Sequence, residues 1–389
     1  MSITTPRGFV ASGLASGIKA SGALDLALLA TDDGVAVPTA ATFTGNLAAA
    51  APVQISRSHM ASNGGRATAV VVSSGNANAA TGERGRDDAR HMCDLVARGL
   101  DVPVEQVLVC STGLIGIPLP MAPIEAGIPG LVAARAGSAE AAERAATGIL
   151  TTDSGRKEVL IESSAFTVAG MAKGAGMLAP NMATMLAFLT TDAAVEPGPL
   201  AELLRIAVRD SFNSMTVDGC TSTNDTVILL ASGRAGTADP NVVVDTVTEA
   251  CSTLAGQMAA DAEGASKIFQ VQVTGARSDG EAHQAARKVA ESLLVKCSIN
   301  GEDPYWGRVA SELGSAGVEF EMDRLDIAYG GVAVCRGGVG ADHDAVAVAT
   351  HMAGSLIEIH CRLGLADGDA VVMGVELGYG YIDENRTTS

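Results

Sequence analysis

Hydrophobic and polar positions alternate between two periods along this chain. Short runs rich in β-branched residues cover 67–72, 107–110 and 226–230, and they predict strands. Between them, apolar residues recur at the spacing of an amphipathic helix. The clearest such set is Leu200, Leu203, Leu204, Ala207 and Val208. This alternation predicts an α/β protein built from layered sheets and helices.

The pattern changes after Pro240. A long helical pattern covers 242–264, a strand-like run covers 269–273, and a second helical pattern covers 282–295. We therefore expect a compact α/β subdomain at about 238–335. Strand-like runs also occur toward the C-terminus, at 325–328, 332–334 and 356–359.

One window carries no charged residue, from Gly174 to Thr191. Its length approaches the ~20 residues that span a bilayer. It also holds Pro180, Asn181 and several threonines, whose polar groups lipid would leave unsatisfied. The window is therefore interpreted as a buried segment of a soluble protein, with an unusual number of hydroxyl groups.

Composition and charge exclude several classes of protein. The 389 residues include 47% hydrophobic and only 3% aromatic ones, so the core is aliphatic and the chain is not disordered. The net charge of −18 disfavours nucleic acid and anionic membranes as partners. The seven cysteines are odd in number and form no CxxC pair, which indicates a cytoplasmic protein without disulfides or zinc. No histidine spacing suits a metal, and the N-terminus lacks the apolar run of a signal peptide.

The general catalytic motifs are weak. Gly174–Gly176 lacks the third glycine and the preceding strand of a dinucleotide loop, and the chain has no P-loop and no G-x-S-x-G elbow. These patterns alone support only an α/β protein with a buried, hydroxyl-rich segment.

Longer motifs carry a resemblance to a known family. Residues 173–186 (KGAGMLAPNMATML) resemble the self-cleavage segment of the ornithine acetyltransferases, also called the glutamate N-acetyltransferase or ArgJ family of arginine biosynthesis. Further segments follow in family order over nearly the whole chain: 17–19, 25–28, 110–116, 151–153, 222–226, 261–264 and 306–309.

This resemblance implies a fold and an activity. The expected fold is α/β (α+β), in the layered α-β-β-α arrangement of the ornithine acetyltransferase/DmpA type, with a smaller C-terminal α/β subdomain. The expected enzyme moves an acetyl group from N2-acetyl-L-ornithine to L-glutamate without a cofactor. The sequence leaves open whether acetyl-CoA also serves as acetyl donor. The expected subunits are an alpha chain, 1–183, and a beta chain, 184–389, assembled as α2β2.

The chemistry of the residues agrees with that role. If the Thr184 hydroxyl attacks the carbonyl carbon of Ala183, the peptide becomes an ester, and water then releases the two chains. Thr184 then carries a free α-amine with a reference pKa of ~7.7–8.0, suited to a general base at neutral pH. One residue thus supplies nucleophile and base. By resemblance, the Thr112 side chain and the Gly113 backbone N–H form the oxyanion hole.

Resemblance also places the substrate contacts, at Thr151, Lys173, Thr184, Glu263, Asn385 and Ser389. We assign Lys173 to a substrate carboxylate and Glu263 to an ammonium group, although Asp261 lies beside Glu263 and could equally end the helix. Three features depart from the family pattern. Ser73 and Tyr305 each replace an asparagine, and the shorter tail leaves open whether Thr388 or Ser389 is the terminal contact.

Two other functions compete with the acetyltransferase. An amidase or aminopeptidase of related fold would use the same self-cleaved threonine with water as acceptor. A non-catalytic binding protein would keep the fold and remain uncleaved. The retention of Thr112, Lys173, Thr184 and Glu263 favours the acetyltransferase.

Overall fold

The computed structural model describes residues 2–177 and 185–387, and two of its sheets form the N-terminal part of the fold. The four-stranded sheet has the order β1 (Phe9–Leu14), β2 (Leu26–Thr31), β5 (Ala69–Asn76), β6 (Val107–Leu114). The six-stranded sheet has the order β4 (Arg66–Ala67), β3 (Val37–Phe43), β11 (Thr226–Gly236), β9 (Leu186–Ala193), β8 (Thr167–Lys173), β7 (Lys157–Glu162). Strands β5 and β6 are parallel, as are β9 and β11.

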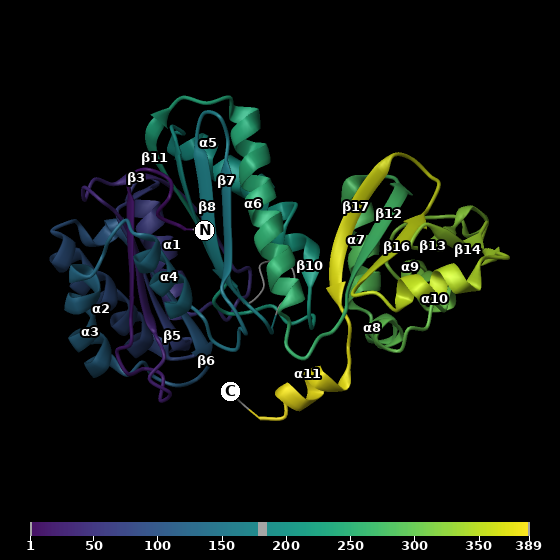
Figure 1. The fold of residues 1–389 in the computed structure, drawn as a ribbon, viewed down its shortest axis with the longest axis horizontal. Coiled ribbons are helices and arrows are strands. Elements are labelled where there is room, and N and C mark those ends of the chain that lie inside the picture. The colour runs from purple at the N-terminus through teal and green to yellow at the C-terminus, as the bar shows by residue number, and fades with distance from the viewer. Residues whose placement is uncertain (1, 178–184, 388–389) are drawn as a thin grey trace.

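These two sheets pack face to face. Val72 and Leu108 from the first sheet share one buried cluster with Phe188 and Ile228 from the second. The outer face of the first sheet is covered by α1 (Ala51–Ser62), α2 (Gly82–Leu100) and α3 (Met121–Ala133), while α4 (Ala139–Gly148) packs along β1. The outer face of the second sheet is covered by α5 (Pro197–Arg209) and α6 (Pro240–Ala260). The layered α-β-β-α arrangement expected from the sequence is confirmed (Figure 1).

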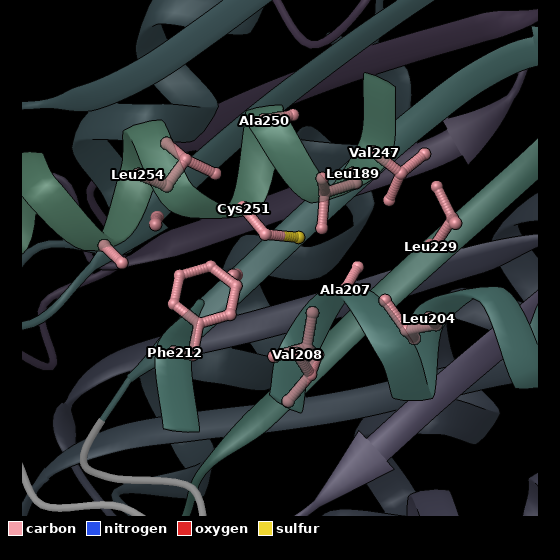
Figure 2. Packing of buried hydrophobic residues seen from close by; sticks show 14 of the residues in the cluster. Leu189, Leu204, Ala207, Val208, Phe212, Leu229, Val247, Ala250, Cys251 and Leu254 are labelled. Carbon is pink, nitrogen blue, oxygen red and sulfur yellow. The ribbon is translucent and has the colours of Figure 1, made fainter. Parts of the chain in front are cut away.

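Helix α5 buries the predicted apolar face in full. Leu200, Leu203, Leu204, Ala207 and Val208 are all buried. Figure 2 shows Leu204 and Val208 of α5, Cys251 and Leu254 of α6, and Leu189 and Leu229 of the sheet, which belong to one buried cluster. The helical period of the sequence therefore marks the face that contacts the sheet.

A seven-stranded sheet builds the C-terminal unit. Its order is β10 (Met215–Thr216), β17 (Gly368–Val375), β12 (Ile268–Ala276), β16 (Leu356–Arg362), β13 (Asp326–Tyr329), β14 (Val332–Arg336), β15 (Val339–Gly340). The helices of this unit are α7 (Asp279–Glu291), α8 (Leu293–Asn300), α9 (Trp306–Gly314) and α10 (Ala345–Met352). Helix α11 (Tyr379–Glu384) follows β17 and leads back to the N-terminal sheets (Figure 1).

The residue bounds of the C-terminal unit differ from the expected 238–335. Helix α6 belongs to the N-terminal layers, because Val247 and Leu254 pack against the six-stranded sheet. The C-terminal sheet then continues to Val375, since β12 pairs on one side with β16 and on the other with β17. The division into chains at 183 and 184 falls outside the described residues and stays a prediction.

No helix in the described ranges is long and apolar enough to cross a membrane.

Candidate active site

A cavity of about 160 Å³ opens beside the ends of β6 and β8. Six residues singled out in the sequence line it, and they come from five separate segments: Thr112, Gly113, Thr151, Lys173, Glu263 and Asn385. The structure thus brings these six together. Ala183, Thr184 and Ser389 lie outside the described residues.

The pair Thr112–Gly113 lies near the end of β6, where β6 runs parallel to β5. Gly113 adopts a φ of +131°, and an added Cβ would lie 2.3 Å from the carbonyl carbon of Gly75. Only glycine allows this approach, so the backbone at the cavity wall is fixed by the sequence. The Thr112 side chain is buried, and its hydroxyl has no hydrogen-bond partner within the described ranges. It is therefore available to a ligand in the cavity.

Lys173, the last residue of β8, supplies a buried positive charge. Its side chain is 3% exposed, and Nζ lies 3.7 Å from Oδ2 of Asp153. Asp153 also accepts from Nζ of Lys157 at 2.7 Å and from the N–H of Gly174 at 2.7 Å. A fully buried carboxylate thus lies between two ammonium groups next to the cavity.

These charges shift one another's pKa values. Burial by itself would raise the pKa of Asp153, but the ammonium groups of Lys173 and Lys157 outweigh it and lower that pKa to about 2. Burial lowers the pKa of Lys173, and Asp153 opposes part of that effect. No role is predicted for Asp153 from the sequence. The signal for it is its place in the family segment 151–153.

Glu263 supplies the opposite charge. It follows α6, and its Oε1 accepts from the Thr152 hydroxyl at 2.7 Å while its Oε2 accepts from Nδ2 of Asn385 at 3.0 Å. Asp261, which caps the end of α6, instead pairs with Lys157 and Ser154. The cavity is therefore bordered by an ammonium group and a carboxylate, as a zwitterionic ligand requires.

The loop before β11 forms another wall, with Ser222, Thr223 and Asn224. The Asn224 amide donates to the carbonyl oxygens of Ala77 at 2.6 Å and Ser111 at 2.8 Å. Both N–H groups are used, so Asn224 holds the wall in place and has no donor left for an oxyanion.

Next along this loop is Asp225, which sequence reasoning also missed. Its side chain is fully buried, and Oδ1 accepts from the backbone N–H of Met185 at 2.9 Å. Across the described ranges, no group of three or more His, Cys, Asp or Glu side chains could hold a metal ion.

Fold and cavity together define the class of protein. At the end of β6 the cavity wall contains Gly113, where only glycine fits. Within the described ranges, the cavity also offers the Thr112 hydroxyl without a hydrogen-bond partner, the buried ammonium group of Lys173 and the Glu263 carboxylate. This set of groups suits acyl transfer to and from an amino acid. The protein is an acyltransferase. More narrowly, residues 10–387 match the ArgJ family, and the chain belongs to that family. The resemblance seen in the sequence is confirmed.

Several relatives match over the full length. The arginine biosynthesis bifunctional protein ArgJ of Thermobifida fusca is 44% identical over 393 residues, covering 100% of both chains. The protein of the same name from Mycobacterium tuberculosis is 42% identical over 394 residues, covering 100% of this chain and 96% of the relative.

Two crystal structures are also similar. That of ArgJ from Bacillus halodurans has 34% identity and a TM-score of 0.49, covering 51% of this chain and 96% of that one. That of ornithine acetyltransferase from Mycobacterium tuberculosis, complexed with ornithine, has 42% identity and a TM-score of 0.44. It covers 46% of this chain and 94% of that one.

Proposed function

We propose that this protein is a cytoplasmic enzyme of arginine biosynthesis that transfers an acetyl group from N2-acetyl-L-ornithine to L-glutamate through an acetyl-Thr184 intermediate. The products are L-ornithine and N-acetyl-L-glutamate. One observation carries the proposal: Thr112, Gly113, Lys173 and Glu263, which are distant in sequence, border one small cavity. Membership of the ArgJ family supports it.

Self-cleavage prepares the nucleophile in this proposal. The Thr184 hydroxyl attacks the carbonyl carbon of Ala183, and water hydrolyses the resulting ester. The amide nitrogen of Thr184 becomes a free α-amine that serves as general base. Lys173 lies before the cut and Glu263 after it, so both chains are needed for one site. The assembly proposed is α2β2.

The first half-reaction loads the enzyme. The α-amine takes the Thr184 hydroxyl proton, and Oγ attacks the acetyl carbonyl carbon of N-acetylornithine. Thr112 and Gly113 donate to the oxyanion. As the intermediate collapses, the amide bond breaks and the ammonium returns its proton to the departing ornithine amine. Lys173 binds the substrate carboxylate, and Glu263 binds the side-chain ammonium.

The second half-reaction reverses this chemistry with another amine. The α-amine of glutamate attacks the acetyl ester, the ester bond to Thr184 breaks, and N-acetylglutamate leaves. The proton lost by the glutamate nitrogen returns to Oγ of Thr184 through the α-amine. No metal or redox cofactor enters either half.

The decisive experiment is turnover of N-acetylornithine with and without glutamate. Continuous ornithine release should depend on glutamate, and without glutamate the beta chain should gain the mass of one acetyl group. Equal release without glutamate would instead indicate the amidase or aminopeptidase. A full-length chain that binds N-acetylornithine without turnover would indicate the binding protein.

A second activity is favoured by the name of the relatives, which are called bifunctional. We propose that acetyl-CoA is a further donor to Thr184, so that the enzyme also acetylates glutamate directly. Turnover of acetyl-CoA with glutamate, run beside the acetylornithine assay, tests this. Formation of N-acetylglutamate from N-acetylornithine but not from acetyl-CoA would restrict the enzyme to the first reaction.

A further inference from the structure

Lys19 lies in a family segment, 17–19, that takes no part in the proposed mechanism. Its backbone is fixed by Asp25, which is fully buried. Oδ2 of Asp25 accepts the N–H groups of Gly17, Ile18 and Lys19, at 3.0, 2.7 and 3.1 Å. Oδ1 accepts the N–H and the hydroxyl of Ser16. Because the loop wraps around one carboxylate, the Lys19 side chain leaves it in a set direction.

The ammonium group of Lys19 joins this loop to a segment far along the chain. Nζ donates to the carbonyl oxygens of Leu24 and Leu150, each at 2.7 Å. Leu24 ends the loop itself, whereas Leu150 directly precedes the family segment 151–153. The two bonds therefore tie residues 150–153 to the loop that Asp25 organises.

Segment 150–153 acts on both charged groups of the cavity. Thr151 lines the cavity. The Thr152 hydroxyl donates to Glu263 at 2.7 Å, and the Asp153 carboxylate lies 3.7 Å from Nζ of Lys173. A shift of this segment would therefore disturb the carboxylate and the ammonium group at the same time.

The aliphatic part of Lys19 makes a separate contact. A Cβ added to Gly75 would lie 3.0 Å from Cγ of Lys19, and Gly75 in turn lies against Gly113. The methylene groups thus pack beside the wall of the cavity, while the ammonium group reaches segment 150–153. A substitution that keeps the methylene groups and removes the charge separates the two contacts.

We propose that Lys19 is a positioning residue for substrate binding: its ammonium group holds segment 150–153 where Thr152 orients Glu263 and Asp153 engages Lys173. The inference rests on the proposed function. Lys173 and Glu263 bind the charged ends of the substrate and not its reacting carbonyl group. The contribution of Lys19 therefore belongs to KM more than to kcat.

Lys19→Met is the direct test, because methionine keeps an unbranched side chain beside Gly75 and has no ammonium group. In the cleaved variant, KM for N-acetylornithine should rise at least about tenfold, the equivalent of one lost hydrogen bond of a charged group. The change in kcat should be smaller, about threefold or less. A cleaved variant with the wild-type KM, or with its whole loss in kcat, would overturn the inference.

A double variant tests the route through segment 150–153. Thr152→Val removes the hydroxyl that binds Glu263 and keeps the branched shape of the side chain. If Lys19 acts through this segment, KM of Lys19→Met/Thr152→Val should rise by less than the product of the two single rises. A rise equal to that product would place the action of Lys19 elsewhere and overturn the inference.

Lys267→Met is the matched control. Nζ of Lys267 also donates to two backbone carbonyl oxygens, those of Met352 and Gly354 at 3.0 and 3.1 Å, but within the C-terminal unit. This variant should lose stability and keep the wild-type KM. If its KM rose as much as that of Lys19→Met, general destabilisation would account for both effects, and Lys19 would have no special role.

A measurement on the wild type covers the case in which Lys19→Met fails to fold or cleave. Reductive methylation of lysines is followed by peptide mass, with and without ornithine, and each rate is taken relative to the exposed Lys288. Bound ornithine should stabilise segment 150–153 and slow the methylation of Lys19. Equal relative rates in active enzyme would refute the role of Lys19 alone. Wild type that releases no ornithine from N-acetylornithine would refute the proposed function itself.

Discussion

Asn224 donates a hydrogen bond to the carbonyl oxygen of Ser111, at 2.8 Å, and so ties the loop before β11 to the strand that carries Thr112 and Gly113. A second bond from the same amide reaches Ala77. If the chain is cut after Ala183, these bonds join the two chains. Four more bonds do the same. Thr44 donates to backbone oxygens of this loop from both its hydroxyl and its N–H, and Asn46 and Ala50 donate one bond each.

The first prediction concerns cleavage and assembly. Wild-type protein should give the masses of 1–183 and 184–389 under denaturing conditions, while Thr184→Ala should stay full-length. In native sizing the two wild-type chains should run together, because loop 221–225 is bonded to segments on the other side of the cut. The proposed assembly predicts that they elute at the mass of α2β2. Thr190→Ala, which removes a neighbouring strand hydroxyl, should still cleave. Active but uncleaved wild type, or separated halves, would contradict this.

The sequence predicted the layered core well because the core follows regular periods. The buried face of α5 matches the helical spacing residue for residue. The strand ends were predicted less well. The β-branched run ending at Cys110 belongs to a strand that continues to Leu114, because Ser111 is buried and its hydroxyl pairs with that of Ser73 at 2.8 Å. The hydrophobic pattern does not predict that a polar residue belongs to a strand when its hydrogen-bond partner is distant in sequence.

The site was predicted through the family motifs, and its supporting contacts were not. Lys173, Glu263 and Asp153 all lie in such motifs, but the role of Asp153 depends on its contact with Lys173, which only the folded chain brings beside it. The limits of the C-terminal unit were missed for a similar reason. Whether α6 packs on one sheet or the other depends on long-range contacts that its own apolar stripe does not specify.

The second prediction tests the oxyanion hole. Thr112→Ala removes one donor and leaves Thr184, Lys173 and Glu263 in place. Because both half-reactions pass through a tetrahedral oxyanion, kcat should fall by about 10²–10³-fold, with a smaller change in KM. Cleavage should remain substantial, and thermal stability should change little because the hydroxyl has no hydrogen-bond partner within the described ranges. If the cleaved variant had a near wild-type kcat, Thr112 would not be an oxyanion donor, and Gly113 would need another donor beside it.

The third prediction concerns Asp153 and pH. Its pKa of about 2 in the folded protein lies below the ~3.9 of the unfolded chain. The unfolded state therefore binds more protons between these values. The contribution of Asp153 to the free energy of unfolding, about 2–3 kcal/mol, is complete above about pH 5 and is lost as the pH falls toward 2. Denaturant titrations of wild type and Asp153→Asn from pH 7 to pH 2 should show the difference between them shrinking with acidification.

A surface variant, Asp87→Asn, serves as the control for Asp153→Asn. Asp153→Asn leaves Lys173 buried without its carboxylate and should cost about 3–5 kcal/mol at pH 7. Asp87→Asn breaks only the exposed pair with Arg90 and should change the free energy of unfolding by less than about 1 kcal/mol. If Asp153→Asn were as stable as Asp87→Asn at pH 7, the buried charge network would not be the source of the pH dependence.

The last prediction concerns the contact that holds the C-terminal helix at the site. Gly264 follows Glu263, and Gly380 lies in α11, which leads to Asn385. A Cβ added to Gly380 would lie 2.4 Å from the carbonyl oxygen of Gly264, and one added to Gly264 would lie 2.0 Å from the carbonyl carbon of Gly380. The two backbones touch, and Asn385, which follows α11, donates to Glu263, which precedes Gly264, at 3.0 Å. We expect the backbone contact to hold this bond in place.

Gly380→Ala should push α11 away from Gly264 and break that bond, while cleavage after Ala183 continues. Losing a hydrogen bond to a charged group is worth about 1.5–3 kcal/mol, so kcat/KM for N-acetylornithine should fall at least about tenfold. Gly256→Ala is the control. Apart from the nearby backbone of α6 itself, no atom in the described part of the chain lies within 4 Å of its added Cβ, so activity should be kept. The double variant Gly380→Ala/Asn385→Ala should be no slower than Asn385→Ala alone, since both changes remove one contact. Additive losses would mean that Gly380 acts on the site by some route other than Asn385.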